Sequence, residues 1–100
     1  MKEGYKAKLQ VNKKPIELNP FVEEFLARIS IGAVTSLKGV DYIQSVKIHH
    51  EHDDVNITVN GEEIPLTPFP VMIIANTLRG LALTLKGVDD IKSLDVSLEY

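Results

Sequence analysis

The chain aligns with itself after a shift of 48 residues, and this internal repeat restricts the possible folds more than any other feature. Between residues 11–52 and 59–100, sixteen of forty-two aligned pairs are identical, and no gap is needed. Unrelated segments of ordinary composition would share roughly three. We therefore interpret residues 1–100 as a single domain built by tandem duplication, with repeats at about 5–52 and 53–100.

Each repeat predicts two short strands, a helix and a third strand. Apolar and polar residues alternate in residues 5–11 and again in residues 55–59, which is the pattern of a strand with one buried face. The following strands contain Pro15 and Pro65, which lack a ladder N–H, so we expect them at the edges of the sheet. Closing strands are predicted near residues 91–100 and, in the first repeat, 43–51.

A long helix is predicted between the second and third strands of each repeat. Asn19 and Thr67 are suitable N-caps, and each is followed by a proline, which the first turn tolerates. Gly39 and Gly87 stand where a left-handed residue would end the helix. Each helix would then have about nineteen residues and a length of about 28 Å.

The order of these elements predicts an α+β domain. Two arrangements of the sheet are compatible with it: two three-stranded sheets joined edge to edge, or closing strands exchanged between the repeats. In both, the tandem ββαβ unit would form two layers, with an antiparallel-rich sheet covered by two long helices.

The second helix is apolar on the side that is polar in the first. The positions of Glu23, Glu24, Ser30 and Thr35 are occupied in the second repeat by Val71, Met72, Leu78 and Leu83. A helix that is apolar all round belongs in a core or at an interface, and burying one aliphatic side chain contributes about 1.5–3 kcal/mol. We therefore expect a homodimer or higher oligomer. The alternative is that the fold buries this helix within the monomer. The predicted interface residues are Val71, Met72, Leu78, Ala82 and Leu83.

All three histidines lie in the polar segment HHEHDD, residues 49–54. In a strand, His50 and His52 would project to one face, and with Asp54 nearby they could bind Zn²⁺ or Ni²⁺. The alternative is a solvated hairpin tip, where polar residues are expected. No third ligand at a recognised spacing occurs elsewhere, so metal binding is the second hypothesis for function.

The remaining sequence indicates no catalytic chemistry. Phosphate-binding, dinucleotide-binding, nucleophile-elbow and zinc-protease motifs are absent, and there is no cysteine, so we expect no cofactor and favour a non-enzymatic role. The basic segment near the start alternates with apolar residues in a chain of net charge −3, so nucleic acid binding is not expected. Its lysines are Lys6, Lys8, Lys13 and Lys14. Without a signal peptide or membrane span, we expect a soluble, cytoplasmic protein.

The string VN-x-x-x-I-x-L-x-PF, followed by a helix and LKGVD, resembles short uncharacterised archaeal proteins with a VNGKEIxLNPFV pattern. The resemblance covers most of each repeat, and the second repeat departs from it at Pro70 and in the apolar outer side of its helix. It implies no activity. The function expected from the residues is therefore self-association.

Overall fold

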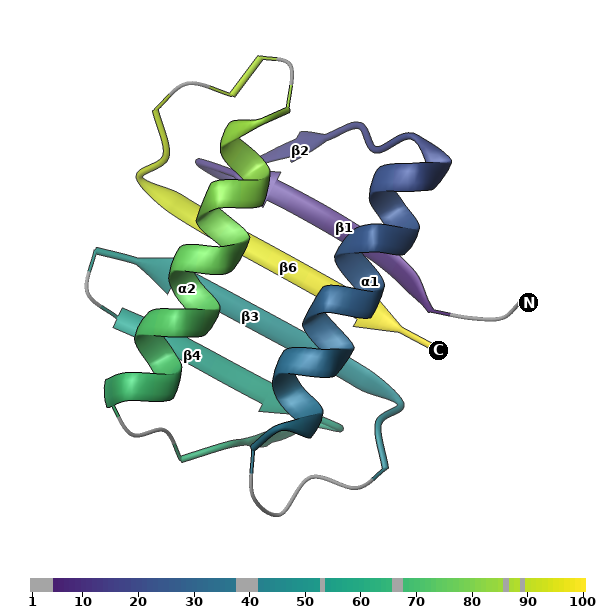
Figure 1. Ribbon diagram of the computed structural model, residues 1–100, viewed down its shortest axis with the longest axis vertical. Helices are drawn as coiled ribbons and strands as arrows, with labels where there is room; N and C mark the ends of the chain where they lie inside the picture. The colour runs from purple at the N-terminus through teal and green to yellow at the C-terminus, as the bar shows by residue number, and fades with distance from the viewer. Residues whose placement is uncertain (1–4, 38–41, 53, 66–67, 86, 89) are drawn as a thin grey trace.

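The computed structural model has an α+β fold with one antiparallel sheet and two helices (Figure 1). It describes residues 5–37, 42–52, 54–65, 68–85, 87–88 and 90–100, and it describes the backbone but not the side chains of Pro68, Phe69 and Val71. The elements in chain order are β1 (Lys6–Val11), β2 (Lys14–Ile16), α1 (Pro20–Thr35), β3 (Ser45–Glu51), β4 (Asp54–Val59), β5 (Glu62–Glu63), α2 (Pro68–Leu83) and β6 (Ser93–Glu99).

The six described strands form one sheet in the order β2-β1-β6-β3-β4-β5. Of the two arrangements left open by the sequence, this is the exchanged one: β6 pairs with β1, and β3 pairs with β4. Each closing strand therefore lies beside the first strand of the other half of the chain. The short strands β2 and β5 are at the two edges, as predicted. Pro15 lies within β2, whereas β5 ends at Glu63 and Pro65 follows the strand.

Two asparagines hold the exchanged strands at their starting ends. Asn12 and Asn60 have positive φ angles of 54° and 53° in the hairpin turns after β1 and β4. Asn12 Oδ1 accepts from two backbone N–H groups at the start of β6, at 2.7 and 3.0 Å, and its Nδ2 donates to a carbonyl just before them at 2.7 Å. The Asn60 side chain makes the same three bonds at the start of β3, at 2.7, 3.1 and 2.7 Å.

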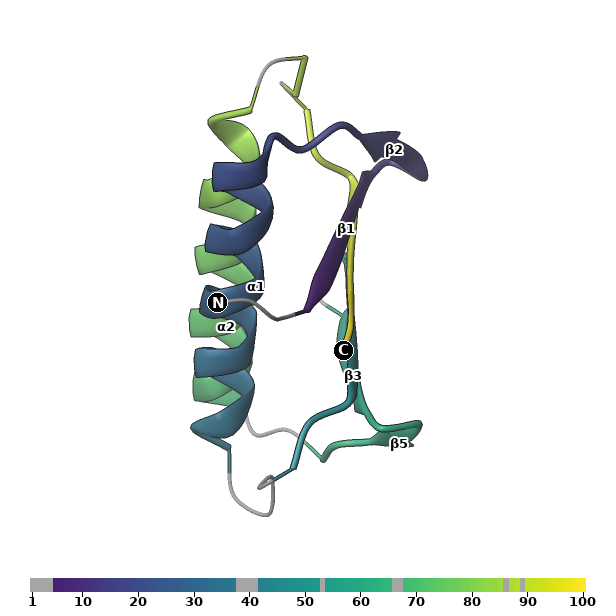
Figure 2. The same ribbon diagram turned by 90° about the vertical axis from the view of Figure 1, so that its right-hand side faces the viewer.

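Both helices lie on the same face of the sheet and run in opposite directions across its strands (Figures 1 and 2). Each has 16 residues, so the prediction of helices of about nineteen residues was wrong. In α1 the hydroxyl groups of Thr35 and Ser36 donate hydrogen bonds to carbonyls of the preceding turn. The backbone N–H of Ser36 donates to the carbonyl of Ala33, three residues earlier. These bonds tighten and end the helix before the predicted stop.

The predicted helix start is confirmed where the structure describes it. Asn19 Oδ1 accepts from the backbone N–H of Val22 at 2.8 Å, and α1 begins at Pro20. Gly87 has a left-handed φ of 84°, but α2 already ends at Leu83, so the prediction that Gly87 ends this helix was wrong. Thr67 and Gly39 lie outside the described residues.

The helix faces that pack on the sheet differ from the predicted ones. The side chain of Glu23 accepts from the backbone N–H of Ala7 in β1 at 3.2 Å, so the side of α1 that bears Glu23 faces the sheet. The large apolar residues Phe21, Phe25 and Ile73 are not on the faces that pack on the sheet: they are 74%, 44% and 51% exposed. The buried helical residues fall at aligned positions in the two helices: Leu26, Ala27, Ser30 and Val34 in α1, and Ile74, Ala75, Leu78 and Ala82 in α2.

The core lies between these helix faces and the inward side chains of the four longer strands. Alternate strand residues contribute to it, among them Leu9, Ile48, Ile57 and Val96, while their neighbours face the other side of the sheet. Neither described helix is long and apolar enough to cross a membrane.

Candidate functional site

The outward side of the two helices is an apolar surface, which we call the outer helix surface. Its large side chains are 44% to 74% exposed and come from both helices. They are Phe21, Phe25, Met72, Ile73 and Leu83. Contiguous exposed apolar patches are uncommon on soluble monomers and usually mark an interaction site.

The structure divides the predicted interface residues between this surface and the core. Met72 and Leu83 belong to the outer helix surface, with exposures of 58% and 47%. Leu78 and Ala82 are only 3% and 1% exposed, so their assignment to the outer side was wrong. Both follow Ala75 at helical spacing and lie on the stripe that packs on the sheet. The side chain of Val71 is outside the described part of the structure.

The outward residues of each helix recur at alternating intervals of three and four, the spacing of a helix seam that meets another helix. In α2 the exposed residues that follow this spacing are Ile73, Asn76, Gly80 and Leu83, and in α1 they are Phe21, Phe25, Arg28, Gly32 and Thr35. The exposed residues Pro20, Glu24, Met72 and Thr77 lie beside this line. Gly32 and Gly80 align in the two halves, and a Cβ built on either one meets nothing within 4 Å. Nothing in the described monomer therefore requires glycine at these two helical positions.

The opposite face of the sheet is open and polar. Figure 2 shows that β2 and β5 both bend away from the helices, toward the side of this open face. His49 lies on it, on β3, directly across from Asp95 on β6. His49 Nδ1 is 2.5 Å from Asp95 Oδ1, and His49 Nε2 is 3.2 Å from Glu51 Oε1.

This contact raises the pKa of His49. The hydrogen bond to Asp95 is the largest cause, and partial burial opposes it. The Tyr100 N–H bonds to the Gln44 carbonyl, so alternation along the ladder makes His49 and Asp95 a non-hydrogen-bonded pair, in which facing side chains come closest. Both ring nitrogens face carboxylates, so His49 is suited to act as a fixed cation and not as a free general base.

A cavity of about 480 Å³ lies on this open face beside His49. Its lining is polar throughout: Lys8, Gln10, Lys13, His49, Asp95 and Ser97. Sequence reasoning missed this group because its members are distant along the chain and meet only through the exchange of β6 to the side of β1. The alternation of β3 did place His49 and His50 on opposite faces, but nothing in the sequence paired His49 with Asp95.

The predicted metal ligands are not brought together. His50 Nε2 is 3.1 Å from the backbone carbonyl of His52, and His52 occupies the β3–β4 turn with a φ of 57°. Within the residues that the structure describes, no three histidine, aspartate or glutamate side chains are grouped so that they could hold a metal ion, and Asp54 joins no such group.

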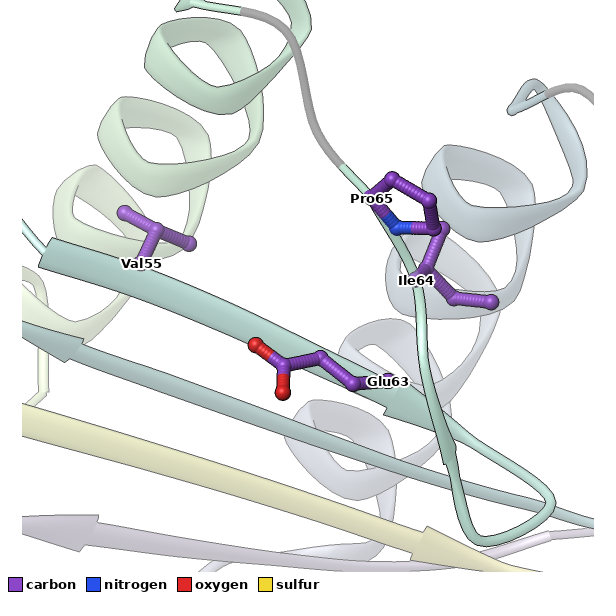
Figure 3. Close-up of a pocket in the computed structure, with 4 residues that line it drawn as sticks. All are labelled: Val55, Glu63, Ile64 and Pro65. Atoms are coloured by element: carbon purple, nitrogen blue, oxygen red, sulfur yellow. The ribbon is translucent and has the colours of Figure 1, made fainter.

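A second cavity, of about 410 Å³, lies at the outer edge of β4 and is lined by Val55, Glu63, Ile64 and Pro65 (Figure 3). Ile64 donates its N–H to the carbonyl of Ile57 at 2.8 Å, so the backbone of Ile57 faces this edge. By the alternation of the ladder, the N–H and carbonyl of Val55 face it too. At the aligned edge of β1, the corresponding N–H is occupied by Glu23.

No protein-family model, curated protein or solved structure matches this chain. The resemblance to short archaeal proteins therefore stays a prediction, and the function has to be argued from the surfaces themselves.

Proposed function

We propose that this chain is a two-layer, tandemly duplicated ββαβ domain whose function is self-association, and that two copies form a homodimer through the outer helix surface. The observation that carries the proposal is the exposure of five large apolar side chains on one face of the molecule. No catalytic arrangement competes with it in the described residues.

The energetic argument rests on the area that remains in contact with water. Fully burying a side chain of this size contributes about 1.5–3 kcal/mol, so covering the exposed parts of all five would contribute on the order of 5 kcal/mol. Part of that gain is lost to the cost of association. Two equivalent surfaces would contribute about 10 kcal/mol, which is of the same order as the cost of association, about 4–15 kcal/mol.

The aligned glycines support a close approach of helices. A glycine inside a helix destabilises it by about 0.5–1 kcal/mol relative to alanine, and neither Gly32 nor Gly80 is explained by a contact within the monomer. A helix of a second copy could approach the backbone closely at both positions. The glycines and the apolar side chains occupy the same outward side of the helices.

A second copy fits this surface better than a charged partner does. The outward side of α2 presents Asn76 and apolar residues, and in α1 the charges of Glu24 and Arg28 are paired with each other at 2.7 Å. An isologous dimer places the same patch on both partners, so each apolar surface would meet another of the same character.

Sedimentation equilibrium at micromolar concentration tests the proposal. The wild type should be a dimer, and Ile73→Glu should shift it to monomer because a carboxylate would be buried in an apolar contact. Gln44→Glu, which adds the same charge at an exposed residue away from the helices, is the matched control and should remain dimeric. A monomeric wild type, or a dimer that Ile73→Glu leaves intact, would contradict the proposal.

Gly80→Ala separates the stability of the fold from association. In the monomer it should raise helix stability by about 0.5–1 kcal/mol, since the added methyl group has room. In the dimer it should weaken the contact, because the helices could no longer approach as closely. Stability and association should therefore change in opposite directions; if both rise, the close approach at Gly80 is wrong.

A further inference from the structure

On the open face of the sheet, Ser97 of β6 has a lysine on each side. The register places Lys8 of β1 and Lys47 of β3 directly opposite Ser97 on its two neighbouring strands. The three residues point to the same face, and both lysines are exposed. Lys47 and Ser97 form a non-hydrogen-bonded pair, for which the typical Cα separation is about 4.5 Å, and Lys8 and Ser97 form a hydrogen-bonded pair, with about 5.5 Å.

These three groups have unused donors. In the described part of the chain, neither Lys8 nor Lys47 takes part in an ion pair. Among the described residues, the only buried side-chain oxygen without a hydrogen-bond partner is that of Ser30. The hydroxyl group of Ser97 is therefore not buried without a partner. Ser97 and Lys8 also line the 480 Å³ cavity, and the volume is within the range of small-molecule sites.

The carboxylates on this face are largely occupied by other cations. Asp95 is bonded to His49, and Glu51 is shared between His49 at 3.2 Å and Lys13 at 3.9 Å. Glu99 lies in the next cross-strand row, opposite Lys6. The row that contains Ser97 continues through Thr58 to Glu63, whose carboxylate accepts from Asn56 Nδ2 at 3.1 Å. With Lys8 and Lys47 against Glu63, the row keeps a local positive charge, although the whole chain has a net charge of −3.

We propose that this row is a binding site for the phosphate group of a small phosphorylated molecule. The ammonium groups of Lys8 and Lys47 and the hydroxyl group of Ser97 donate to the phosphate oxygens, and the remainder of the ligand lies in the cavity toward Gln10 and Lys13. Charge-assisted hydrogen bonds of this kind are about twice as strong as neutral ones. The site is on the opposite face of the sheet from the helices, so it does not depend on the proposed dimer.

Titration with inorganic phosphate, followed by amide chemical shifts at constant ionic strength, tests the site. The shifts should saturate and should be concentrated at residues 8, 47 and 97. Lys8→Ala and Lys47→Ala should each weaken binding about tenfold, the effect of losing one hydrogen bond to a charged group. Lys14→Ala removes the same charge from β2, outside the cavity, and should leave the affinity unchanged.

Two further arms distinguish the possible results. Acetate at the same concentration should bind more weakly than phosphate, because its charge and number of acceptor oxygens are smaller. The Ile73→Glu variant should bind phosphate as the wild type does, whether or not it dimerises. Shifts spread evenly over all lysines, or an equal loss of affinity in Lys14→Ala and Lys8→Ala, would overturn the site in favour of nonspecific charge attraction.

Discussion

The edges of the sheet at β1 and β4 occupy aligned positions in the two halves of the chain, and among the described residues a helix side chain bonds only the β1 edge. At β1 the N–H of Ala7 donates to the Glu23 carboxylate, which α1 provides. In the second half the aligned helix residue is Val71, and a valine side chain has no oxygen to offer the aligned N–H of Val55. The β4 edge accordingly borders a cavity (Figure 3). Of these two aligned helix residues, only Glu23 can therefore accept a hydrogen bond from a strand edge with its side chain.

The two helices also differ in polarity, and again the second is the less polar. The first retains the Glu24–Arg28 ion pair on its outer side and buries the hydroxyl of Ser30, which has no hydrogen-bond partner among the described residues. The second presents Met72 outside, at the position of Glu24, and buries Leu78 at the position of Ser30. The second helix is thus the less polar of the two, and it provides three of the five side chains of the proposed dimer contact.

The largest expected difference in the free energy of unfolding is between variants at the aligned residues Ser30 and Leu78. Leu78→Ala should reduce the free energy of unfolding by about 2–5 kcal/mol, because it leaves a cavity under α2. Ser30→Ala should raise it by about 1 kcal/mol, because it removes an unsatisfied buried hydroxyl. Urea denaturation of both variants measures the difference. Destabilisation by Ser30→Ala would show that the hydroxyl has a partner.

The asparagines that hold the exchanged strands should matter about equally in the two halves. Asn12→Ala and Asn60→Ala should each destabilise the fold by about 1–3 kcal/mol, since three backbone groups lose their side-chain partner and alanine tolerates positive φ poorly. The matched controls Asn12→Asp and Asn60→Asp keep the oxygen acceptor and should lose less. Thermal unfolding of all four variants checks this. A negligible effect at either position would argue against its role in the exchange.

Glu23→Val makes the first half resemble the second. It should cost about 1–2 kcal/mol, because the hydrogen bond to a charged acceptor is lost. Amide hydrogen exchange gives the site-specific result: the Ala7 amide should be protected in the wild type and exchange faster in the variant, while Val55 should exchange rapidly in both. Equal protection of Ala7 and Val55 in the wild type would contradict the difference between the edges.

The smallest expected effect is the pH dependence contributed by His49. Its pKa is raised in the folded state, so its stabilising contribution is fully present below its unfolded pKa of about 6.5 and is lost as pH rises through the folded value. Because His49 and Asp95 side chains are 35% and 32% exposed, solvent screening keeps the contribution below about 1 kcal/mol.

Denaturation midpoints between about pH 5.5 and 8 test this, in a range where the carboxylates stay ionised. The difference in stability between the wild type and His49→Gln should shrink as pH rises. Asp95→Asn removes the main cause of the shift and should bring the pKa of His49 down. A difference that stays constant over this range would show that the pair is not coupled.

The local features of the fold were predictable because their causes are local. Asn19 caps α1, prolines mark the edge strands, and alternation gave the buried positions of β1 and β4. The pattern of apolar residues did not predict which face of each helix packs on the sheet. Both sides of α2 are apolar, and in α1 the polar residues Ser30 and Glu23 are on the side that faces the sheet. The His49–Asp95 pair depends on the register between strands far apart in the chain, which no local pattern encodes.

Contacts between protomers test the central claim most directly. In a sample that mixes isotope-labelled and unlabelled chains, isotope-filtered nuclear Overhauser spectra detect proton pairs that belong to different copies. The proposed dimer predicts cross-protomer contacts from the methyl groups of Met72, Ile73 and Leu83 and from the ring of Phe25. Their absence in a sample that sediments as a dimer, or contacts confined to Val55 and Ile64 at the β4 edge, would contradict it.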